Sequence, residues 1–512
     1  MFSQVKAKSG KTLNGSSCTE AIIINTIPLL IDGKEVLHES QDDTFKVYHP
    51  EHGKQTSLVQ GANEETVGKA IAGAKEAFSS WSKIPAFKRR DILWKAAELL
   101  QERKKELEES YRHDTHVSEM ITEFDNGMAA EHLRSAATIA TEIKGEIPPV
   151  LEGTLSLVTR VPYGVIFSMS PFNMGSILAI RTFCYALACG NTVVWKANPT
   201  VPSLHMGLCK VMWDAGVPPG ALQMIHFAPG TEPKLTEQVL AHPDIRLVNF
   251  TGSTRVGSII GSLAGKYVKP AILELGGNAP ALVFASADLR LAANNIVFGG
   301  LVHSGQICMS TSRIVVVKEA ADELIKELES IVKDNFPHIG KMGLATQGGV
   351  DKMVHLVEDA VKKGAVPLGH AISIQKRPSS DHDAIGYTPI ILDRVTSEQQ
   401  IYTEETFGPS LIVIRAKDVE DAIRIANDSD VGLSASIWTR DYKQALDVAQ
   451  RIECGAVHIN STSVHDEPAL PHGGFKNSGF GRFNSMAAGM AFTTTKSITM
   501  HEPKMLPLSV LG

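Results

Sequence analysis

Cysteine is scarce and follows no pattern in this 512-residue chain. No Cys-x-x-Cys pair and no regular spacing occurs among the six cysteines, which are Cys18, Cys184, Cys189, Cys209, Cys308 and Cys454. This usage argues against a disulfide framework and against a cysteine-based zinc site. We therefore expect a protein of a reducing compartment that holds no metal.

The sequence also lacks a strong excess of charge and a long hydrophobic run. A formal net charge of −6 gives no sign of nucleic acid or a membrane surface as a partner. The most apolar stretches, Ala21–Ile31 and Ser176–Cys189, are interrupted by Asn25 and Pro28 or by Arg181. Both are too short to span a bilayer, so we expect neither a nucleic-acid partner nor a membrane anchor.

Acidic residues and arginine are absent from the first 19 positions, which carry Lys6, Lys8 and Lys11. A transit peptide is one interpretation of such a segment, but the missing arginine and the lack of a clear amphipathic pattern favour a flexible arm. The last residues, Ser509–Gly512, form no peroxisomal signal. We expect a cytoplasmic protein.

Hydrophobic residues make up 43% of the chain, enough for large cores in two or three domains. Helical patterns occupy Asn63–Trp81, Ala86–Tyr111 after Pro85, and Val117–Ile143. Asn63 is suited to the N-cap position of the first helix, because its side chain can accept a bond from the first turn.

Strands and helices alternate from residue 154 onwards. Such alternation predicts β-α-β units, parallel sheets and ligand binding at the carboxyl ends of the strands. In the first region we expect strands Thr154–Arg160, Gly164–Met169, Thr192–Trp195, Leu222–His226 and Arg246–Phe250, and helices Ser176–Cys189, Val201–Ala215 and Lys234–Ala241. In the second we expect strands Pro280–Phe284, Arg313–Val317, Ser434–Trp438 and Ala456–Ile459, and helices Ala287–Leu301, Ala320–Val332, Val419–Asn427 and Tyr442–Ile452, with helix and loop over 341–382.

The last long strand pattern, Thr493–Met500, is rich in β-branched residues. Its position near the C-terminus and its capacity to pair predict a role in subunit association, with the strand Thr154–Arg160 as a pairing partner.

Two residues in the middle of the chain have the chemistry of a base and a nucleophile. Glu274 follows an apolar strand and precedes Gly276–Gly277, and Cys308 lies in a polar turn after the helix Ala287–Leu301. Strand ends of open α/β sheets can converge on one cleft, which would place the carboxylate beside the thiol. The alternatives are a small core cysteine and a charge at a strand end.

The segment Phe250–Gly257 passes from a strand into a helix through Gly252 and Gly257. A glycine at such a turn lets backbone N–H groups approach a phosphate at the helix N-terminus. The segment is not a G-x-G-x-x-G motif, so an ordinary strand-helix turn is the alternative.

Several separate motifs, in order, resemble those of the NAD(P)-dependent aldehyde dehydrogenase superfamily, and the resemblance extends over about residues 30 to 502. Within that superfamily, Gly305–Thr311 resembles the branch of vanillin, benzaldehyde and salicylaldehyde dehydrogenases. The matching segments are Pro171–Asn173, Gly190–Lys196, Phe250–Gly257, Leu273–Gly277, Gly305–Cys308, Glu404–Pro409 and Pro471–Arg482.

The resemblance implies an α/β fold with two parallel-sheet domains and a small β element for oligomerisation. A Rossmann-like cofactor domain would comprise 1–142 and 162–273, a catalytic domain 274–480, and the oligomerisation element 143–161 and 490–502. A homodimer or homotetramer is the implied assembly.

The resemblance further implies that the Cys308 thiolate attacks an aldehyde and that Asn173, with the Cys308 backbone N–H, stabilises the oxyanion. Glu274 would activate water to release the acid. NAD or NADP is the implied cofactor. Its implied binding residues are Ser168, Met169, Pro171, Phe172, Lys196, Gly230, Thr251, Gly252, Ser253, Val256, Leu275, Glu405 and Phe407.

The chain departs from the family pattern at several positions. Phe172 stands where tryptophan is usual, Asn278 where lysine is usual, and His472 where phenylalanine is usual. Pro199 stands where many NAD-preferring members carry a glutamate that repels a 2′-phosphate, so NADP is an open alternative to NAD.

We expect the substrate to be an aromatic or bulky apolar aldehyde, with aliphatic aldehydes as an alternative. Two rival functions use the same residues differently. A hydrolase could cleave esters with Cys308 and Glu274 and no redox step, and a protein of the same fold could serve as a non-catalytic scaffold.

Overall fold

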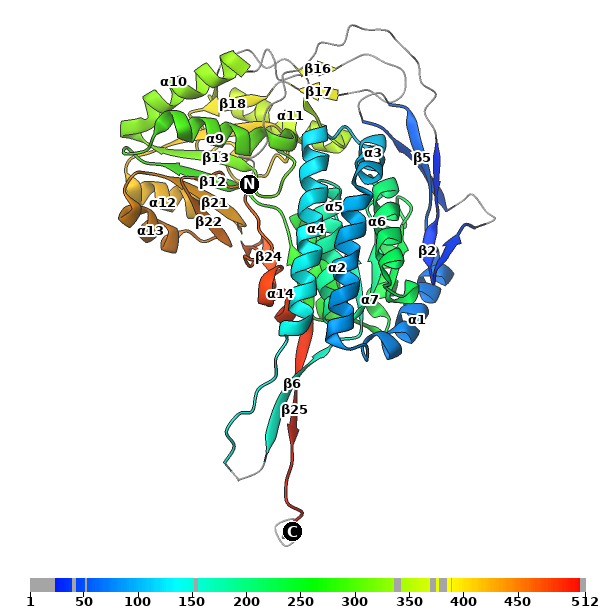
Figure 1. Ribbon diagram of the computed structural model, residues 1–512. Coiled ribbons are helices and arrows are strands. Elements are labelled where there is room, and N and C mark those ends of the chain that lie inside the picture. The colour runs from blue at the N-terminus through cyan, green and yellow to red at the C-terminus, as the bar shows by residue number, and fades with distance from the viewer. Residues whose placement is uncertain are drawn as a thin grey trace.

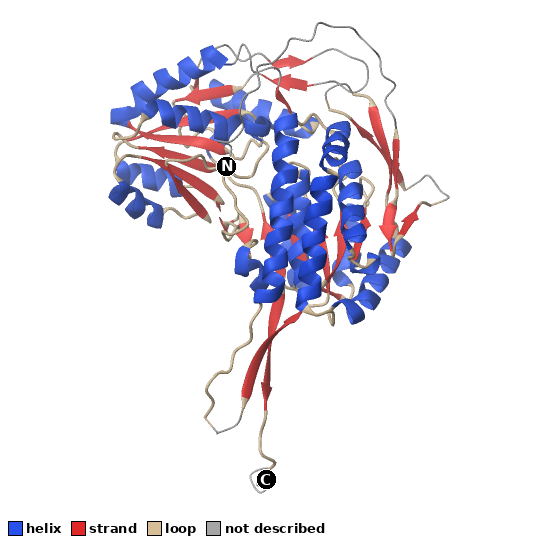
Figure 2. Ribbon diagram, in the orientation of Figure 1, coloured by secondary structure: helices blue, strands red, loops and turns tan. Residues whose placement is uncertain are grey.

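The computed structural model describes residues 24–38, 43–50, 53–151, 155–335, 342–368, 374–376, 385–387 and 389–506. Two large sheets flanked by helices form the body of the molecule, and a two-stranded ribbon projects from it (Figures 1 and 2). The predicted α/β fold class with two mainly parallel sheets is confirmed. The arm at residues 1–19, the C-terminal residues 509–512 and parts of 341–382 lie outside the described residues.

The first sheet has eight strands with a parallel centre and antiparallel edges. Val165, Phe167 and Met169 face one layer of helices whereas Ile166 faces the other, so the central strand is buried on both sides. In spatial order the strands are β24 (Gly479–Phe480), β11 (Ala271–Glu274), β10 (Ile245–Thr251), β7 (Val165–Met169), β8 (Thr192–Lys196), β9 (Leu222–Ile225), β2 (Leu29–Ile31) and β3 (Lys34–Val36).

Helices pack on both faces of this sheet. One face is covered mainly by α1 (Glu64–Trp81), α7 (Glu232–Ala241) and α8 (Thr254–Lys266). The other is covered by α2 (Ala86–Glu102), α3 (Lys104–Asp114), α4 (Glu119–Glu142), α5 (Gly175–Ala188) and α6 (Pro202–Ala215), which stand together in the centre of Figure 1.

The second sheet has seven strands, all parallel except the edge strand β15. Its strands in spatial order are β15 (Val366–Pro367), β18 (Ile390–Asp393), β19 (Ser410–Ala416), β13 (Thr311–Val317), β12 (Ala279–Val283), β21 (Ser434–Trp438) and β22 (Ala456–Ile459). Figure 1 shows α9 (Leu289–Leu301) and α10 (Lys318–Asn335) on one side and α12 (Val419–Asn427) and α13 (Tyr442–Arg451) on the other.

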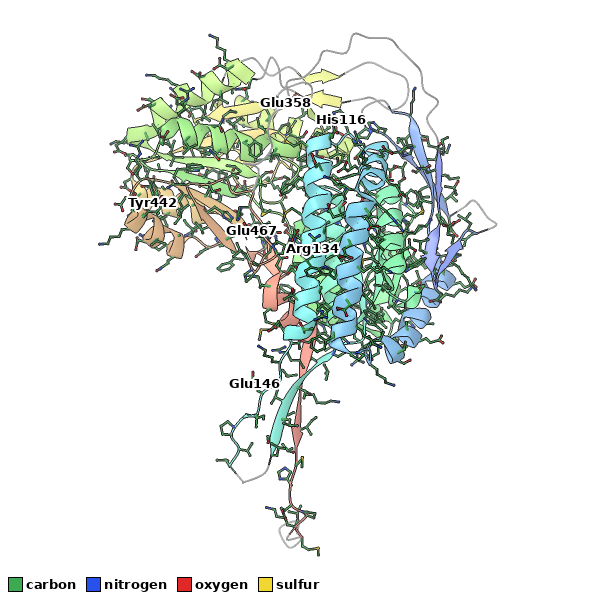
Figure 3. The ribbon with its side chains drawn as sticks, viewed as in Figure 1. His116, Arg134, Glu146, Glu358, Tyr442 and Glu467 are labelled. Carbon is green, nitrogen blue, oxygen red and sulfur yellow. The ribbon has the colours of Figure 1, made fainter. Side chains whose placement is uncertain are left out.

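The projecting ribbon consists of β6 (Ser156–Pro162) and β25 (Thr493–Thr499), which pair antiparallel from Thr493↔Pro162 to Thr499↔Ser156. The predicted pairing of these two segments is therefore present. Glu146, labelled beside the ribbon in Figure 3, forms an isolated bridge to Val158.

Smaller elements complete the structure. They are β1 (Asn25–Ile27), β4 (Thr44–Tyr48), β5 (Gln55–Gln60), β14 (Met342–Gly343), β16 (Ile374–Lys376), β17 (Ile385–Tyr387), β20 (Val431–Gly432), β23 (Phe475–Lys476), α11 (Gln347–Lys362), α14 (Ser485–Ala491) and the 3-10 turns η2 (Pro219–Ala221), η3 (Val302–Gly305) and η4 (Gln400–Tyr402).

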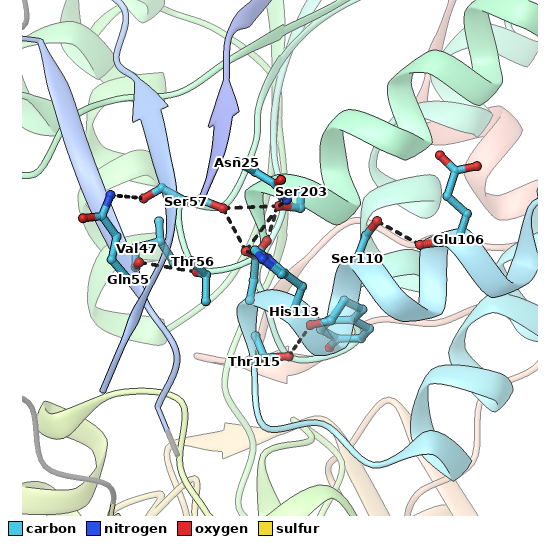
Figure 4. Close-up of polar contacts among 12 residues, drawn as sticks. Asn25, Val47, Gln55, Thr56, Ser57, Glu106, Ser110, His113, Thr115 and Ser203 are labelled. Atoms are coloured by element: carbon cyan, nitrogen blue, oxygen red, sulfur yellow. Dashed lines mark hydrogen bonds and ion pairs between the residues drawn. The ribbon is translucent and has the colours of Figure 1, made fainter. Parts of the chain in front are cut away.

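A buried carboxylate joins the N-terminal strands to the helical layer. Asp114 is fully buried, and its Oδ1 accepts a bond from the Ser57 hydroxyl at 3.0 Å while its Oδ2 accepts the Ser203 N–H at 2.8 Å. Ser57, Ser203 and Asn25, from β5, α6 and β1, meet at this point in Figure 4. The bonds satisfy a buried charge that would otherwise destabilise the fold.

Several details differ from the sequence-based expectations. The predicted single helix Ala86–Tyr111 is wrong, because α2 ends at Glu102 and α3 starts at Lys104, with Arg103 at φ −94° and ψ 13° between them. The strands β1 to β5, β17 to β20, β23 and β24 were not predicted. The expected helix and loop over 341–382 is also wrong at the strands β14, β15 and β16, while α11 confirms the helix there. In the described part of the chain, no helix is long and apolar enough to cross a membrane, and no group of three or more His, Cys, Asp or Glu residues could hold a metal ion.

Candidate active site

Glu274 and Cys308 come together where the two large sheets meet. Glu274 ends β11, and Cys308 lies in the turn between η3 and β13. The two side chains lie close enough for each to shift the pKa of the other. Glu274 is 1% exposed, whereas Cys308 is partly exposed. The expected convergence of a carboxylate and a thiol is thus present.

Two glycines permit this close approach. A Cβ at Gly277, three residues after Glu274, would clash with the carbonyl oxygen of Cys308. A Cβ at Gly305 would clash with the carbonyl oxygen of Gly408, and Gly305 has a φ of +70°. A side chain would not fit at either position, so only glycine lets the backbone at 277 approach that of Cys308 and the backbone at 305 approach that of Gly408.

Asn173 lies beside the turn 306–310 that carries the proposed nucleophile Cys308, which we call the nucleophile turn. Its side-chain amide donates to the Gln306 carbonyl at 2.8 Å, and Asn173 itself is 4% exposed. The buried Tyr111 hydroxyl lies 2.9 Å from the carbonyl of Asn173 and accepts the Gly175 N–H at 3.2 Å. An amide carries two N–H donors, so one can fix Asn173 to the turn while the other serves a ligand.

Arg181 and His472 flank the Glu274 carboxylate, and both also face Asp466. Arg181 lies 2.8 Å from Asp466 and 3.5 Å from Glu274. His472 places Nε2 3.5 Å from Glu274 and Nδ1 3.7 Å from Asp466. Arg181 also lies over the ring of Phe483 at 5.0 Å. Because buried charges are costly unless paired, this mutual arrangement is what lets them occupy the interior.

These neighbours set the protonation of the pair. Burial raises the pKa of the Cys308 thiol well above its ordinary value, and the Glu274 charge raises it further while Arg181 opposes both. Burial also raises the pKa of Glu274, but the approach of the His472 imidazole to 3.5 Å and the positive charge of Arg181 outweigh burial and hold that pKa below its ordinary value. The site therefore holds a protonated thiol beside a carboxylate that can accept its proton.

A cavity opens beside Cys308. Most of its wall is apolar and comes from α4, α5 and the nucleophile turn, while its polar end carries the charged groups described above. The apolar residues are Ile121, Phe124, Met128, Met174, Ile177, Leu178, Ile307, Met309 and Val464, and the others are His132, Asn173, Arg181, Cys308, Asp466 and His472. In Figure 3, Glu467, the neighbour of Asp466, lies between α4 and the lobe that contains the second sheet.

A second group of predicted residues lies at the carboxyl ends of β8 and β10. Lys196 ends β8 and is partly exposed, and among the described residues its ammonium has no hydrogen bond or ion pair. Burial lowers its pKa. Ser253 caps α8 by accepting the Val256 N–H at 3.4 Å, and the Gly252 N–H donates to the Glu274 carbonyl at 3.0 Å. A backbone hydrogen bond thus joins the turn before α8 to Glu274.

Glu405 and Phe407 approach the same region from the second sheet. Glu405 accepts the Gly277 N–H at 3.2 Å, and burial raises its pKa from 4.5 to about 7. The ring of Phe407 meets that of Phe172 edge-on, with centroids 6.4 Å apart. Glu405 therefore lies beside the segment that carries Glu274, and Phe407 lies beside the segment that carries Asn173.

Comparison with known proteins shows the family to which this chain belongs. The model of the aldehyde dehydrogenase family matches residues 37–498. The chain belongs to the aldehyde dehydrogenase family. It is 38% identical to a vanillin dehydrogenase of Pseudomonas sp. (strain HR199 / DSM 7063), covering 94% of this chain and 99% of that protein. It is 36% identical to a salicylaldehyde dehydrogenase of Pseudomonas putida, covering 91% and 96%.

A solved structure agrees with the sequence comparison. The crystal structure of a salicylaldehyde dehydrogenase from Pseudomonas putida G7, complexed with salicylaldehyde, matches with a TM-score of 0.88 at 34% identity and covers 94% of this chain and 99% of that one. The predicted family and enzyme class are confirmed: the chain is an aldehyde dehydrogenase that uses NAD or NADP to oxidise an aldehyde to an acid. The rival hydrolase and scaffold interpretations gain no support from these comparisons.

The residues at the strand ends fit a dinucleotide. The Lys196 ammonium, which has no partner among the residues that the structure describes, could donate to ribose hydroxyls, and the Glu405 carboxylate could accept from them. The N-terminus of α8, after Gly252, presents backbone N–H groups of the kind that bind phosphate oxygens.

Other predicted cofactor residues have side chains that do not reach a cleft. The Ser168 hydroxyl is buried and lies 3.2 Å from the Thr182 carbonyl, and Met169 and Leu275 are buried in a core cluster. Contacts from these three to a cofactor would use the backbone. The remaining predicted residues occupy turns and strand ends: Pro171 and Phe172 between β7 and α5, Thr251 at the end of β10, Val256 in the first turn of α8, and Gly230 after β9 with φ +91°.

Sequence reasoning assigned no role to Arg181, Asp466 or Tyr111. Arg181 did carry a signal, because it is the charge that interrupts the apolar run Ser176–Cys189, and a charge inside a buried helix needs a partner. Asp466 is 285 residues away along the chain, and nothing in its local sequence marks it as that partner.

Proposed function

We propose that this aldehyde dehydrogenase acts on aromatic or other bulky apolar aldehydes. The observation that supports this best is the cavity, in which nine apolar side chains lead to the Cys308 thiol. Such a wall favours a planar apolar substrate, since it offers a small aliphatic or charged aldehyde little compensating contact. The relatives named for vanillin and salicylaldehyde act on aromatic aldehydes and support the same substrate class.

The first chemical role belongs to Cys308 and Asn173. The sulfur attacks the aldehyde carbon, the thiol proton passes to a nearby base or water, and the carbonyl oxygen becomes an oxyanion. The Asn173 amide and the Cys308 backbone N–H donate to this oxyanion, and each such donor stabilises it by about 3 kcal/mol in comparable enzymes. When bound, NAD or NADP accepts the hydride that leaves the carbon, and a thioester on Cys308 remains.

Glu274 acts in the second half of the reaction. Its carboxylate takes a proton from water while the water oxygen attacks the thioester carbon. The carbon–sulfur bond then breaks, the acid leaves, and the Cys308 thiolate is restored. Lys196 and Glu405 would hold the two riboses of the cofactor, Ser253 and Gly252 would hold its pyrophosphate, and Phe407 would contact its nicotinamide end.

An aldehyde panel assayed with both cofactors tests the substrate class. We expect benzaldehyde-type substrates to give a higher kcat/KM than acetaldehyde or succinic semialdehyde, measured as absorbance at 340 nm. The reverse ranking would contradict the proposal. Absence of any absorbance change with every aldehyde, together with ester cleavage, would favour the hydrolase.

Variants test the assigned roles. Cys308→Ala should lower kcat about 10³-fold or more, and Glu274→Gln about 10²- to 10⁴-fold. Cys454→Ala is the matched control, because Cys454 is buried near the end of α13, away from the cavity. Equal activity of Cys308→Ala and the control would refute the proposed role of Cys308 as the nucleophile.

We also propose that the enzyme is a cytoplasmic homodimer or homotetramer, associated through the ribbon of β6 and β25. Apart from the bridge between Glu146 and Val158, these two strands pair only with each other among the described residues, and Leu155, Ile498 and Met500 expose large apolar side chains there. Sedimentation of Ile498→Lys should show a smaller assembly than the parent chain. An unchanged assembly would place the interface elsewhere.

The domain division into 1–142 with 162–273, 274–480, and 143–161 with 490–502 is likewise a proposal. The sheet order supports most of it, although the last residues of the proposed catalytic domain, Gly479–Phe480, pair with β11 of the first sheet. Limited proteolysis with mapping of the first cuts would test where the boundaries lie.

A further inference from the structure

His472 occupies a position from which it can act on Glu274. Its backbone is fixed by two hydrogen bonds with Phe483, and its side chain is 7% exposed at the polar end of the cavity. Nε2 faces the Glu274 carboxylate at 3.5 Å and Nδ1 faces the Asp466 carboxylate at 3.7 Å. Each ring nitrogen thus faces an acceptor, so a nitrogen that carries a proton points it toward a carboxylate.

Three buried polar atoms around the carboxylate have no hydrogen-bond partner among the described residues. They are Oε1 of Glu274, Nε2 of His472 and Nη2 of Arg181. Glu274 Oε1 lies 3.5 Å from His472 Nε2, and Glu274 Oε2 lies 3.5 Å from Arg181 Nη2, distances at the limit of direct bonds. Buried polar groups are rarely left without partners, and ordered water is a common partner for such atoms.

We propose that His472 is a positioning residue for thioester hydrolysis: it orients the Glu274 carboxylate and donates to the water that Glu274 activates. The inference rests on the proposed roles of Cys308 and Glu274. The water oxygen bonds to the acyl carbon, one water proton moves to Glu274, and the carbon–sulfur bond breaks to release the Cys308 thiolate. His472 orients the water and the carboxylate, and it transfers no proton in this step.

The residue type matters for this role. The resemblance to the family indicates phenylalanine as the usual residue at this position, and a phenyl ring has no donor for a carboxylate or a water. In this chain the second step would therefore depend on a side chain that many relatives lack. Asp466, which also accepts from the Asn484 amide at 2.8 Å, holds the far side of the imidazole.

Three substitutions separate the functions of the ring. His472→Gln can keep a donor near the position of Nε2, toward Glu274. His472→Asn keeps one only near Nδ1, toward Asp466, and His472→Phe removes both. His465→Phe is the matched control, because His465 is in the same loop but lies 3.4 Å from Glu467 and outside the cavity wall.

The experiment follows 4-nitrophenyl acetate cleavage, which forms and hydrolyses an acyl-enzyme on Cys308 without cofactor, and NAD(P)H formation with benzaldehyde in parallel. We expect His472→Phe and His472→Asn to keep the initial nitrophenolate burst per folded chain while the steady rate falls about tenfold to a hundredfold. Mass spectrometry of quenched samples should show the acylated Cys308 accumulating. His472→Gln and His465→Phe should stay within about threefold of the parent.

The inference is overturned if His472→Phe keeps the parent's steady rate, if burst and steady phase fall together, or if His472→Gln behaves like His472→Phe. Its failure differs from failure of the proposed function. A parent enzyme that forms no NAD(P)H with any aldehyde refutes the latter, whereas a parent that turns over normally beside an equally active His472→Phe refutes the inference alone.

Discussion

The charges around the cavity beside Cys308, the proposed substrate pocket, and those of Lys196 and Glu405, the proposed cofactor cleft, are held in different ways. In the pocket, Arg181 lies within 4 Å of both Asp466 and Glu274, and His472 faces the same two carboxylates. In the cleft, neither Lys196 nor Glu405 has an ion pair within 4 Å among the described residues, and burial shifts the pKa of each toward its neutral form.

The difference separates charges that belong to the fold from charges that serve a ligand. A paired buried charge is compensated in the folded chain, so removing its partner leaves an expensive isolated ion. An unpaired charge costs folding free energy until a ligand arrives to compensate it. Substitutions of the paired charges in the pocket should therefore lower stability, whereas substitutions of the unpaired charges in the cleft should weaken cofactor binding without lowering stability.

The largest effect is expected for Arg181→Met, which leaves two buried carboxylates without their arginine. We expect the free energy of unfolding to fall by about 3–5 kcal/mol, measured by denaturant titration. Arg440→Met, at an arginine whose side chain is 73% exposed, should change it by less than about 0.5 kcal/mol. Equal effects of the two substitutions would contradict the idea that the pocket charges belong to the fold.

Lys196→Met should weaken cofactor binding without weakening the fold. Loss of a charge-assisted bond of about 1.5–3 kcal/mol should raise the Kd for NAD or NADP about tenfold to a hundredfold in a calorimetric titration. Lys266→Met, at the exposed end of α8, is the control and should bind like the parent. A drop in stability with unchanged Kd would place Lys196 among the structural charges.

Glu405→Gln should show a pH dependence with a defined sign. The folded-state pKa of about 7 lies above the ordinary 4.5, so the folded chain keeps a proton that the unfolded chain loses as pH rises. The stability contributed by Glu405 is thus fully present below pH 4.5 and is lost as pH rises through about 7. The variant, which stays neutral, should melt about 2 °C above the parent at pH 8 and at the same temperature at pH 4.5. A difference that does not change with pH would contradict this assignment.

Pro199→Glu should give the smallest change. A carboxylate three residues after Lys196 would repel a 2′-phosphate, so kcat/KM with NADP should fall about three- to tenfold relative to NAD. Pro199→Gln controls for the loss of proline. A ratio that changes equally in both variants would show that the backbone, and not the charge, is responsible.

Much of the candidate site was predictable because its residues come in short motifs. Glu274 at a strand end, Cys308 in a polar turn and Lys196 at the end of β8 lie where the local pattern places them. Asn63 caps α1 through a reciprocal pair of bonds with Thr66, as its sequence predicts. These features depend on interactions within a few residues, so a local reading suffices.

Other features have no local cause. The helix pattern continues through Arg103, where the chain nevertheless breaks between α2 and α3. The two-residue strand β24 owes its existence to β11, more than 200 positions earlier, since Gly479 fits against Leu273 with no room for a side chain. Two strands so far apart in the sequence pair only after the rest of the sheet has brought them together.

By itself the sequence determined the alternation of strands and helices, the motif order and the choice of Glu274 and Cys308 as the proposed reacting pair, because hydrophobic periodicity and turn chemistry act over short distances. Tertiary structure alone decided which charges face one another. Arg181, Asp466 and His472 meet Glu274 only when α5, the segment after β22 and the end of β11 are packed together. A buried charge is tolerated by virtue of partners that folding delivers from elsewhere in the chain.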